Sequence, residues 1–140
     1  MFSECKSLEE ITIPNTVTEF GEDAFSSCAL AKVTFEAGRT EDLSIDSYFL
    51  EWNSKLTEVA IVDKITLCAG AFNGTVVKKT VIDTEANNVQ FNKYCFVYDH
   101  VSKDLRIYVR NDAMKEKITK NKFLYVKPEN VIVGLPNENA

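Results

Sequence analysis

Apolar and polar residues alternate in several short stretches of this chain, and a period of two is typical of strands that bury one face. The clearest stretches carry three apolar pairs: Ile11/Ile13, Val33/Phe35 and Val59/Ile61. A further alternation follows at Ile65/Leu67 and at Val89/Phe91. Strands this short are unstable alone, so we expect them to stack in parallel, about 4.8 Å apart, around a shared core.

Phenylalanine recurs at a nearly constant interval, which marks the chain as a repeat array. The spacings are 23, 24, 23 and 24 residues, and the positions are Phe2, Phe25, Phe49, Phe72 and Phe96. The last two copies are decayed, and their strands are predicted from two sets of residues: Val77, Thr80 and Ile82, then Leu105, Ile107 and Val109. The phenylalanines are expected to close each coil from the side opposite the strands.

The period stops after Val109, and the remaining pattern predicts a cap. Asn111 or Asp112 begins a short helix through about Lys120, with Met114 and Ile118 on one face. Two apolar runs, residues 123–126 and 131–133, are predicted to be closing strands or extended pieces. We therefore divide the chain into three parts: an array of about five copies over residues 1–109, the first incomplete and the fourth decayed; a cap over 110–136; and a flexible tail over 137–140.

The first copy carries a specific family pattern. It reads Phe-x-x-Cys-x-x-Leu-x-x-Ile-x-Ile-Pro-x-x-Val-x-x-Phe-Gly-x-x-Ala-Phe from Phe2 to Phe25, and this resembles the BspA-type leucine-rich repeats. The resemblance implies a leucine-rich repeat solenoid of short parallel β-strands in a right-handed coil, with a helical terminal cap. It also implies an extracellular or cell-surface protein that binds host or matrix proteins.

Charge is unevenly distributed along the 140 residues, whose formal net charge is -5. Residues 1–99 hold 8 Lys/Arg and 16 Asp/Glu, a net of -8, whereas residues 100–127 hold 8 and 3, a net of +5. The acidic total disfavours a general affinity for nucleic acid or anionic membranes. No apolar run approaches the roughly 18 residues of a spanning helix. The N-terminus has no signal-peptide pattern and opens inside a repeat, so we expect a piece of a longer protein.

The four cysteines raise the question of a disulfide or a metal site. Cys5 and Cys28 share one repeat position, where a bridge between neighbouring rungs is geometrically conceivable. Trp52 fills the same position in the third copy, which indicates an inward-facing volume rather than a ligand. Cys68 and Cys95 complete no Cys-x-x-Cys pair, so the favoured interpretation is four buried thiols.

Candidate chemistry is sparse. His100 is the only histidine, and the adjacent acids are Glu9/Glu10, Glu22/Asp23 and Glu41/Asp42. Neighbouring residues on a strand point to opposite faces, and acids in turns are usually solvated. No catalytic residue, cofactor or metal is therefore predicted. Asn73-Gly74-Thr75 matches a glycosylation sequon, but Asn-Gly is also a common turn pair.

Two outward columns are predicted on the strand wall. A charge ladder of alternating sign is predicted just before the strands: Glu10, Lys32, Glu58, Lys79 and Asp104. Opposite charges on neighbouring strands contribute about 0.2–1 kcal/mol per pair, so this ladder is expected to fix the register. The second column is mostly small and forms the candidate partner-binding face: Thr12, Thr34, Ala60, Val81 and Arg106, with Tyr108 beside them. A flat face of this kind suits a partner, and it also suits a surface that merely stays soluble.

Protein binding or adhesion is the leading function predicted, with an unidentified protein partner. The alternative is a structural region that caps or spaces a binding or catalytic module elsewhere in the parent chain. An enzyme ranks third. The uncapped first rung, from Phe2 to Ile13, is further expected to expose apolar surface and to self-associate.

Overall fold

The computed structural model describes most of the strand wall and the cap. The described residues are 7–19, 25, 28–45, 53, 55–62, 64–68, 77–93, 95, 105–124 and 126–136. Four of the five phenylalanine positions, together with Cys5, Trp52, Asn73, His100 and the tail at 137–140, lie outside these residues.

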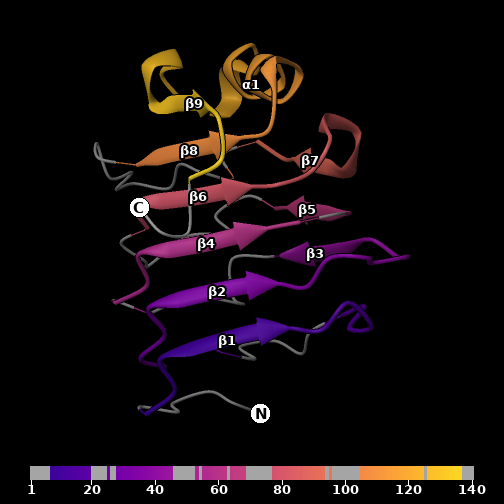
Figure 1. Ribbon diagram of the computed structural model, residues 1–140, viewed down its shortest axis with the longest axis vertical. Helices are drawn as coiled ribbons and strands as arrows, with labels where there is room; N and C mark the ends of the chain where they lie inside the picture. Colours follow the sequence, from indigo (N-terminus) through magenta and orange to yellow (C-terminus); the bar gives the residue numbers. More distant parts are fainter. Residues whose placement is uncertain are drawn as a thin grey trace.

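Six strands form one sheet in which every pair is parallel. Its order is β1-β2-β4-β6-β8-β9, so successive rungs of the stack follow the chain upward (Figure 1). The strands are β1 (Glu10–Ile13), β2 (Lys32–Phe35), β4 (Glu58–Ile61), β6 (Lys79–Ile82), β8 (Arg106–Val109) and β9 (Val131–Val133).

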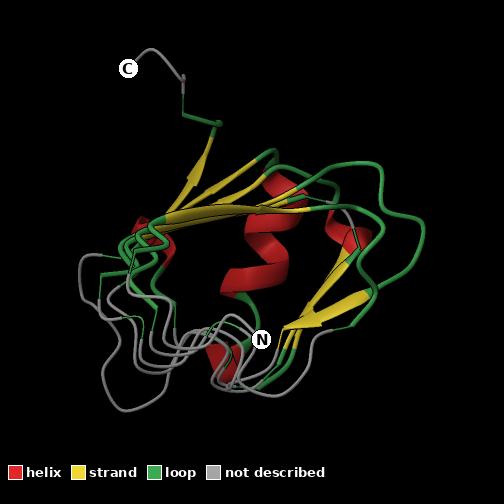
Figure 2. Cartoon of the chain, turned by 90° about the horizontal axis from the view of Figure 1, so that it is seen from below, coloured by secondary structure: helices red, strands yellow, loops and turns green. Residues whose placement is uncertain are grey.

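A second parallel sheet forms a shorter wall. It has the order β3-β5-β7 and contains β3 (Leu43–Ile45), β5 (Ile65–Leu67) and β7 (Val89–Phe91). Seen along the stack, the two sheets lie on different sides of a common interior, and helix α1 lies across it (Figure 2). β5 and β7 were predicted from their alternating residues, whereas β3 was missed although Leu43-Ser44-Ile45 repeats the same pattern.

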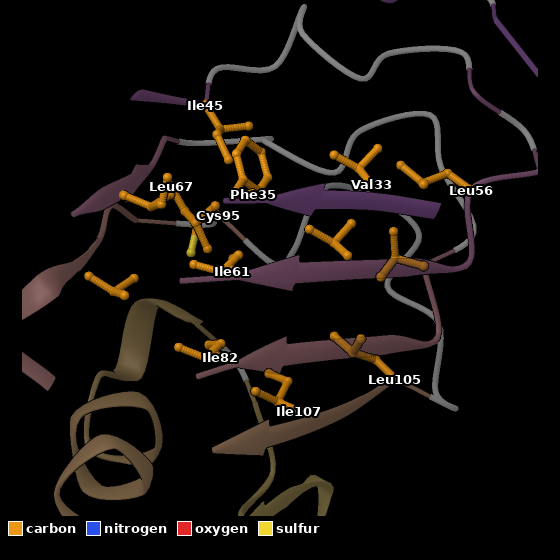
Figure 3. Packing of buried hydrophobic residues seen from close by; sticks show 14 of the residues in the cluster. Val33, Phe35, Ile45, Leu56, Ile61, Leu67, Ile82, Cys95, Leu105 and Ile107 are labelled. Carbon is orange, nitrogen blue, oxygen red and sulfur yellow. The ribbon is translucent and has the colours of Figure 1, made fainter. Parts of the chain in front are cut away.

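The alternation of apolar residues explains the packing. Four strands, β2, β4, β6 and β8, share a half-buried, buried, half-buried, buried pattern. Their inward side chains and those of the second sheet point into one interior (Figure 3). Full burial of each large apolar side chain contributes about 1.5–3 kcal/mol, which compensates for the shortness of each strand. Two parallel walls with a shared core fit a repeat solenoid.

The fourth copy has the predicted strand. β6 pairs with β4 so that Lys79 lies opposite Glu58 and Ile82 lies opposite Ile61. Thr80 faces inward and is fully buried, where β4 has Val59 and β8 has Ile107. Decay of the sequence pattern has therefore not interrupted the ladder.

The described parts of the second copy's anchor unit are buried. Phe25 is 4% exposed and Cys28 is 6% exposed. Cys95, which precedes a phenylalanine position, is fully buried as well. Burial was predicted for all four cysteines; it is confirmed for Cys28 and Cys95, whereas Cys68 is only half-buried.

The cap contains the predicted helix, α1 (Asp112–Thr119), which buries Met114 and Ile118. The side chain of Asn111 accepts a hydrogen bond from the backbone N–H of Met114, as expected of an N-cap. Three short 3-10 helices complete the elements of the described residues: η1 (Ala86–Asn88), η2 (Lys122–Leu124) and η3 (Pro128–Asn130).

The two predicted closing segments differ. Residues 131–133 form β9, the last strand of the six-stranded sheet. The prediction of a strand or extended piece at 123–126 is wrong over its first part, because Phe123 and Leu124 belong to η2. The backbone N–H of Leu124 donates to the carbonyl of Asn121, so a local turn satisfies it in place of a ladder bond.

Candidate functional site

The outer face of the six-stranded sheet carries a column of charges at the start of its strands. Register places the members opposite one another in this order: Glu10, Lys32, Glu58, Lys79 and Arg106. We call this set the charge column. Glu58 is shared by two cations, at 3.9 Å from the ammonium nitrogen of Lys32 and 3.6 Å from that of Lys79. The first four members were predicted to be aligned, and they are.

The fifth member of the predicted ladder is wrong. Lys79 lies opposite Arg106, whereas Asp104 was expected there and lies outside the described residues. The prediction slipped by two residues because Leu105, Ile107 and Val109 all fit an alternating strand. A shift of two keeps every side chain on its face, so the hydrophobic pattern alone could not detect it.

A second column runs beside the first along the same face. Its members, in register order, are Thr12, Thr34, Ala60, Val81, Tyr108 and Ile132. We call this set the central column. Arg106 was expected in it, but the same slip applies, and Tyr108 takes the place opposite Val81. All six side chains are exposed or half-buried, so they form one continuous surface.

The character of the face changes along the stack. Its first rungs present two threonines in the central column, and its last rungs present Val81, Tyr108 and Ile132. The ammonium of Lys79 lies 5.9 Å from the centre of the Tyr108 ring, within the range of a cation–π contact. The C-terminal end of the face is therefore both more apolar and more cationic than its beginning.

An ionic cluster borders the face where β6 and β8 end. Arg110 donates to Asp83 at 2.9 Å and to Glu85 at 3.1 Å, and Asn111 donates to Glu85 at 3.0 Å. These hydrogen bonds from Arg110 and then Asn111 lower the pKa of Glu85. The bonds to Asp83 and Glu85 raise the pKa of Arg110. The cluster joins the start of the cap to the preceding rung.

Lys117 joins the helix to the second wall. Its ammonium donates to the carbonyl oxygens of Ala86 and Val89, and it lies 5.8 Å from the centre of the Phe91 ring. Burial lowers the pKa of Lys117. Spacing in the sequence gave no sign of this contact, because the partners are 31 and 28 residues away.

A buried arginine, also missed from the sequence, holds the turn that follows β1. Arg39 is 3% exposed and donates to the carbonyls of Pro14 and Val17. Its burial lowers its pKa, while Asp42 and Glu36 act in the opposite direction. The contact joins the segment after β2 to the turn after β1 and so connects the first two rungs.

Asn53 makes an equivalent connection in the interior. Its amide nitrogen donates to the carbonyl of Phe25 at 2.8 Å, and its amide oxygen accepts from the N–H of Leu30 at 3.3 Å. The side chain is fully buried, so these bonds satisfy backbone groups that water cannot reach. An asparagine directly after Trp52, which fills the repeated cysteine position, was the signal available in the sequence.

The acidic pairs singled out in the sequence are exposed where the structure describes them. No set of three or more His, Cys, Asp and Glu side chains there could hold a metal ion. Glu9, Glu10, Glu41 and Asp42 are exposed, and Asp42 accepts a hydrogen bond from Thr66 at 2.7 Å. Glu22, Asp23 and His100 lie outside the described residues. Within the described segments, no helix has the length and apolarity needed to cross a membrane.

Comparison with known proteins identifies the repeat. A family model described as BspA type Leucine rich repeat region matches residues 1–102 in 6 copies. Neither the curated proteins nor the solved structures contain a match to the chain.

Proposed function

Because this chain belongs to the BspA type leucine-rich repeat family, we propose that it is a non-catalytic protein-binding or adhesion module that uses the outer face of its six-stranded sheet. The family itself suggests a module for protein interaction or adhesion and is generally non-catalytic. We further propose a place in a longer surface or secreted protein and a right-handed coil, the hand that parallel strand crossovers adopt in about 98% of cases.

One observation carries the proposal. The central column continues without a break across six strands, with half-buried or exposed side chains throughout. Thr12, Thr34 and Ala60 are small, so a partner can approach the sheet closely over the first rungs. Stacked repeats create extended surfaces of this kind, and repeat proteins use them for binding.

The test measures binding of the immobilised chain to a panel of purified extracellular matrix proteins by surface plasmon resonance. Thr34→Arg places a long charged side chain in the central column and should abolish binding of any protein that the wild type captures. Ser44→Arg is the matched control, because Ser44 is an exposed strand residue on the outside of the other sheet. Equal loss in both variants, or no loss in either, would contradict a role for the outer face.

The structural alternative has one supporting observation. α1 packs against β8, β9 and η1, and the inward side chains at this end of the stack, Val109 and Val131, are buried. A region built to cap or space a parent protein needs such an end. If a longer parent protein binds a matrix protein that this chain does not bind, and Thr34→Arg in that parent changes nothing, the structural function is supported.

A further inference from the structure

The charge column is balanced over its first four members and unbalanced at the fifth. From Glu10 to Lys79 the signs alternate, and Glu58 pairs with the lysine on either side. Between Lys79 and Arg106 the sign repeats, which places two cations on directly opposed residues. Like charges in this position destabilise a sheet. The pair of Lys79 and Arg106 therefore destabilises the sheet, whereas the other pairs of the charge column stabilise it.

Arg106 is not neutralised by an acid in the described part of the chain. Its Nη1 donates to the carbonyl of Leu105 at 3.2 Å and to the amide oxygen of Asn130 at 3.0 Å, both uncharged acceptors. The guanidinium has five N–H donors in a planar fork, so further donors are available to a carboxylate. Asn130 holds one side of the guanidinium in place, so less side-chain entropy of Arg106 is lost when a ligand binds.

The side chains next to Arg106 supply an apolar contact at a defined spacing. Tyr108 is two residues further along β8 on the same face, with Val81 and Ile132 opposite it on the neighbouring strands. Residues two apart on a strand are separated by about 6.6 Å. Arginine and tyrosine are also among the residues enriched in the energetically important parts of interfaces.

We infer that the surface formed by Lys79, Arg106, Tyr108, Val81 and Ile132 binds an extended acidic protein segment. In the partner, a carboxylate side chain would face Arg106, and an apolar side chain two residues away would face Tyr108. The spacing of an extended segment matches the spacing of β8, because both have the same rise per residue. The inference rests on the proposed function and assigns the chemistry of the partner.

A nucleic acid is the less suitable anion. The chain has a net charge of -5, and at physiological salt charges more than about 8 Å apart are largely screened. A short peptide therefore experiences mainly the local cations, whereas a polyanion extends over the acidic repeats as well. The apolar central column also suits aliphatic side chains better than phosphates.

The experiment uses the full chain and a fluorescently labelled twelve-residue peptide with the repeating sequence Glu-Ser-Leu-Ser, measured by anisotropy. Matched peptides replace Glu by Gln or by Lys. We expect the Glu peptide to bind at least roughly tenfold more tightly than the Gln peptide, because charge-assisted bonds are about twice as strong as neutral ones. Binding should weaken with added salt, and the Lys peptide should not bind.

Four variants locate the site. Arg106→Gln should weaken binding of the Glu peptide roughly tenfold, and Tyr108→Thr severalfold, since Thr is the residue found in this column at Thr34. Ser44→Ala and Lys55→Gln are controls, one at an exposed strand residue of the other sheet and one at an exposed turn residue. Circular dichroism and thermal melts verify that each variant is folded.

Two results would overturn the inference: Glu and Gln peptides that bind equally, or a folded Arg106→Gln variant that binds as wild type does. Equal affinity for a single-stranded oligonucleotide of the same charge would also overturn it, in favour of a general anion surface. If a matrix protein binds the chain and only Thr34→Arg prevents this, the proposed function stands and the acidic-segment inference fails.

Discussion

The repeat body and the C-terminal cap are held by different kinds of contact. In the body, β1, β2, β4, β6 and β8 form one ladder of parallel backbone bonds, and corresponding positions on the rungs bury mostly apolar side chains. In the cap, individual polar side chains on and before α1 reach back to the preceding rung: Arg110, Asn111 and Lys117. The body is therefore redundant, whereas the cap depends on a few residues, and substitutions should act differently on the two regions.

The largest effect is expected for a core residue of the body. Ile61→Ala removes a fully buried side chain from β4 and should lower the free energy of unfolding by about 2–5 kcal/mol. Urea denaturation measures this loss. Ile132→Ala is the matched control, because Ile132 is 36% exposed and its truncation should cost clearly less. Equal losses would contradict the packing described for β4.

In the cap, Lys117→Met should lower the free energy of unfolding by about 1–3 kcal/mol, because the carbonyls of Ala86 and Val89 lose a charged donor while the aliphatic stem is kept. Hydrogen exchange should show faster opening of α1 than of β2 and β4. Lys122→Met is the control, since Lys122 is exposed. A similar change in Lys122→Met would mean that the loss of charge, and not the two contacts, is responsible.

Thr80 on β6 is a polar side chain at an inward strand position of the body, where the neighbouring strands have apolar residues. The hydroxyl of Thr80 is fully buried and has no hydrogen-bond partner in the described structure. Thr80→Val should raise the free energy of unfolding by about 1 kcal/mol, because the cost of burying an unsatisfied hydroxyl is removed. The reverse change on the preceding rung, Val59→Thr, should lower the free energy of unfolding by a comparable amount. A loss of stability in Thr80→Val would show that the hydroxyl has a favourable role.

A smaller effect is expected for the charge column. Lys32→Glu places three acids on successive strands and should lower the melting temperature, with a loss of about 0.2–1 kcal/mol for each affected pair. Lys55→Glu has the same change of charge at an exposed turn and serves as the control. An unchanged melting temperature in Lys32→Glu would refute the hypothesis that the column fixes the register.

The smallest effect is expected for the pH dependence of stability at Glu85, where the cap contacts the body. The pKa of Glu85 in the folded chain lies below its ordinary value of 4.5, because Arg110 and Asn111 donate to the carboxylate. Its contribution to stability is therefore present above about pH 4.5 and is lost as the pH falls through the folded-state pKa. Glu85→Gln should reduce the loss of stability between neutral and acidic pH.

Thermal melts across this pH range make the measurement, with Glu129→Gln as a control at an exposed carboxylate in η3. The control should keep the wild-type decline. If both variants decline as the wild type does, the cluster around Arg110 does not contribute to acid sensitivity.

The sequence by itself determined the repeating elements of this protein. Alternating apolar residues located β2, β4, β5, β6 and β7, and the spacing of Met114 and Ile118 located the buried face of α1. These are local properties, because a strand or a helix requires a period within a few neighbouring residues. The same alternation occurs at Leu43 and Ile45, so β3 was equally predictable from the sequence.

Only the tertiary structure decided the contacts between rungs. The slip of two residues in β8 satisfies the alternation equally well, so pairing with β6 was needed to place Arg106 beside Lys79 and Tyr108 beside Val81. Arg39, Asn53 and Lys117 bond to partners 22 to 31 residues away. Which side chains meet over such separations depends on how the coils stack, and no period in the sequence encodes it. The candidate binding surface could therefore be defined only from the tertiary structure, since its chemistry follows from the side chains that stacking brings together.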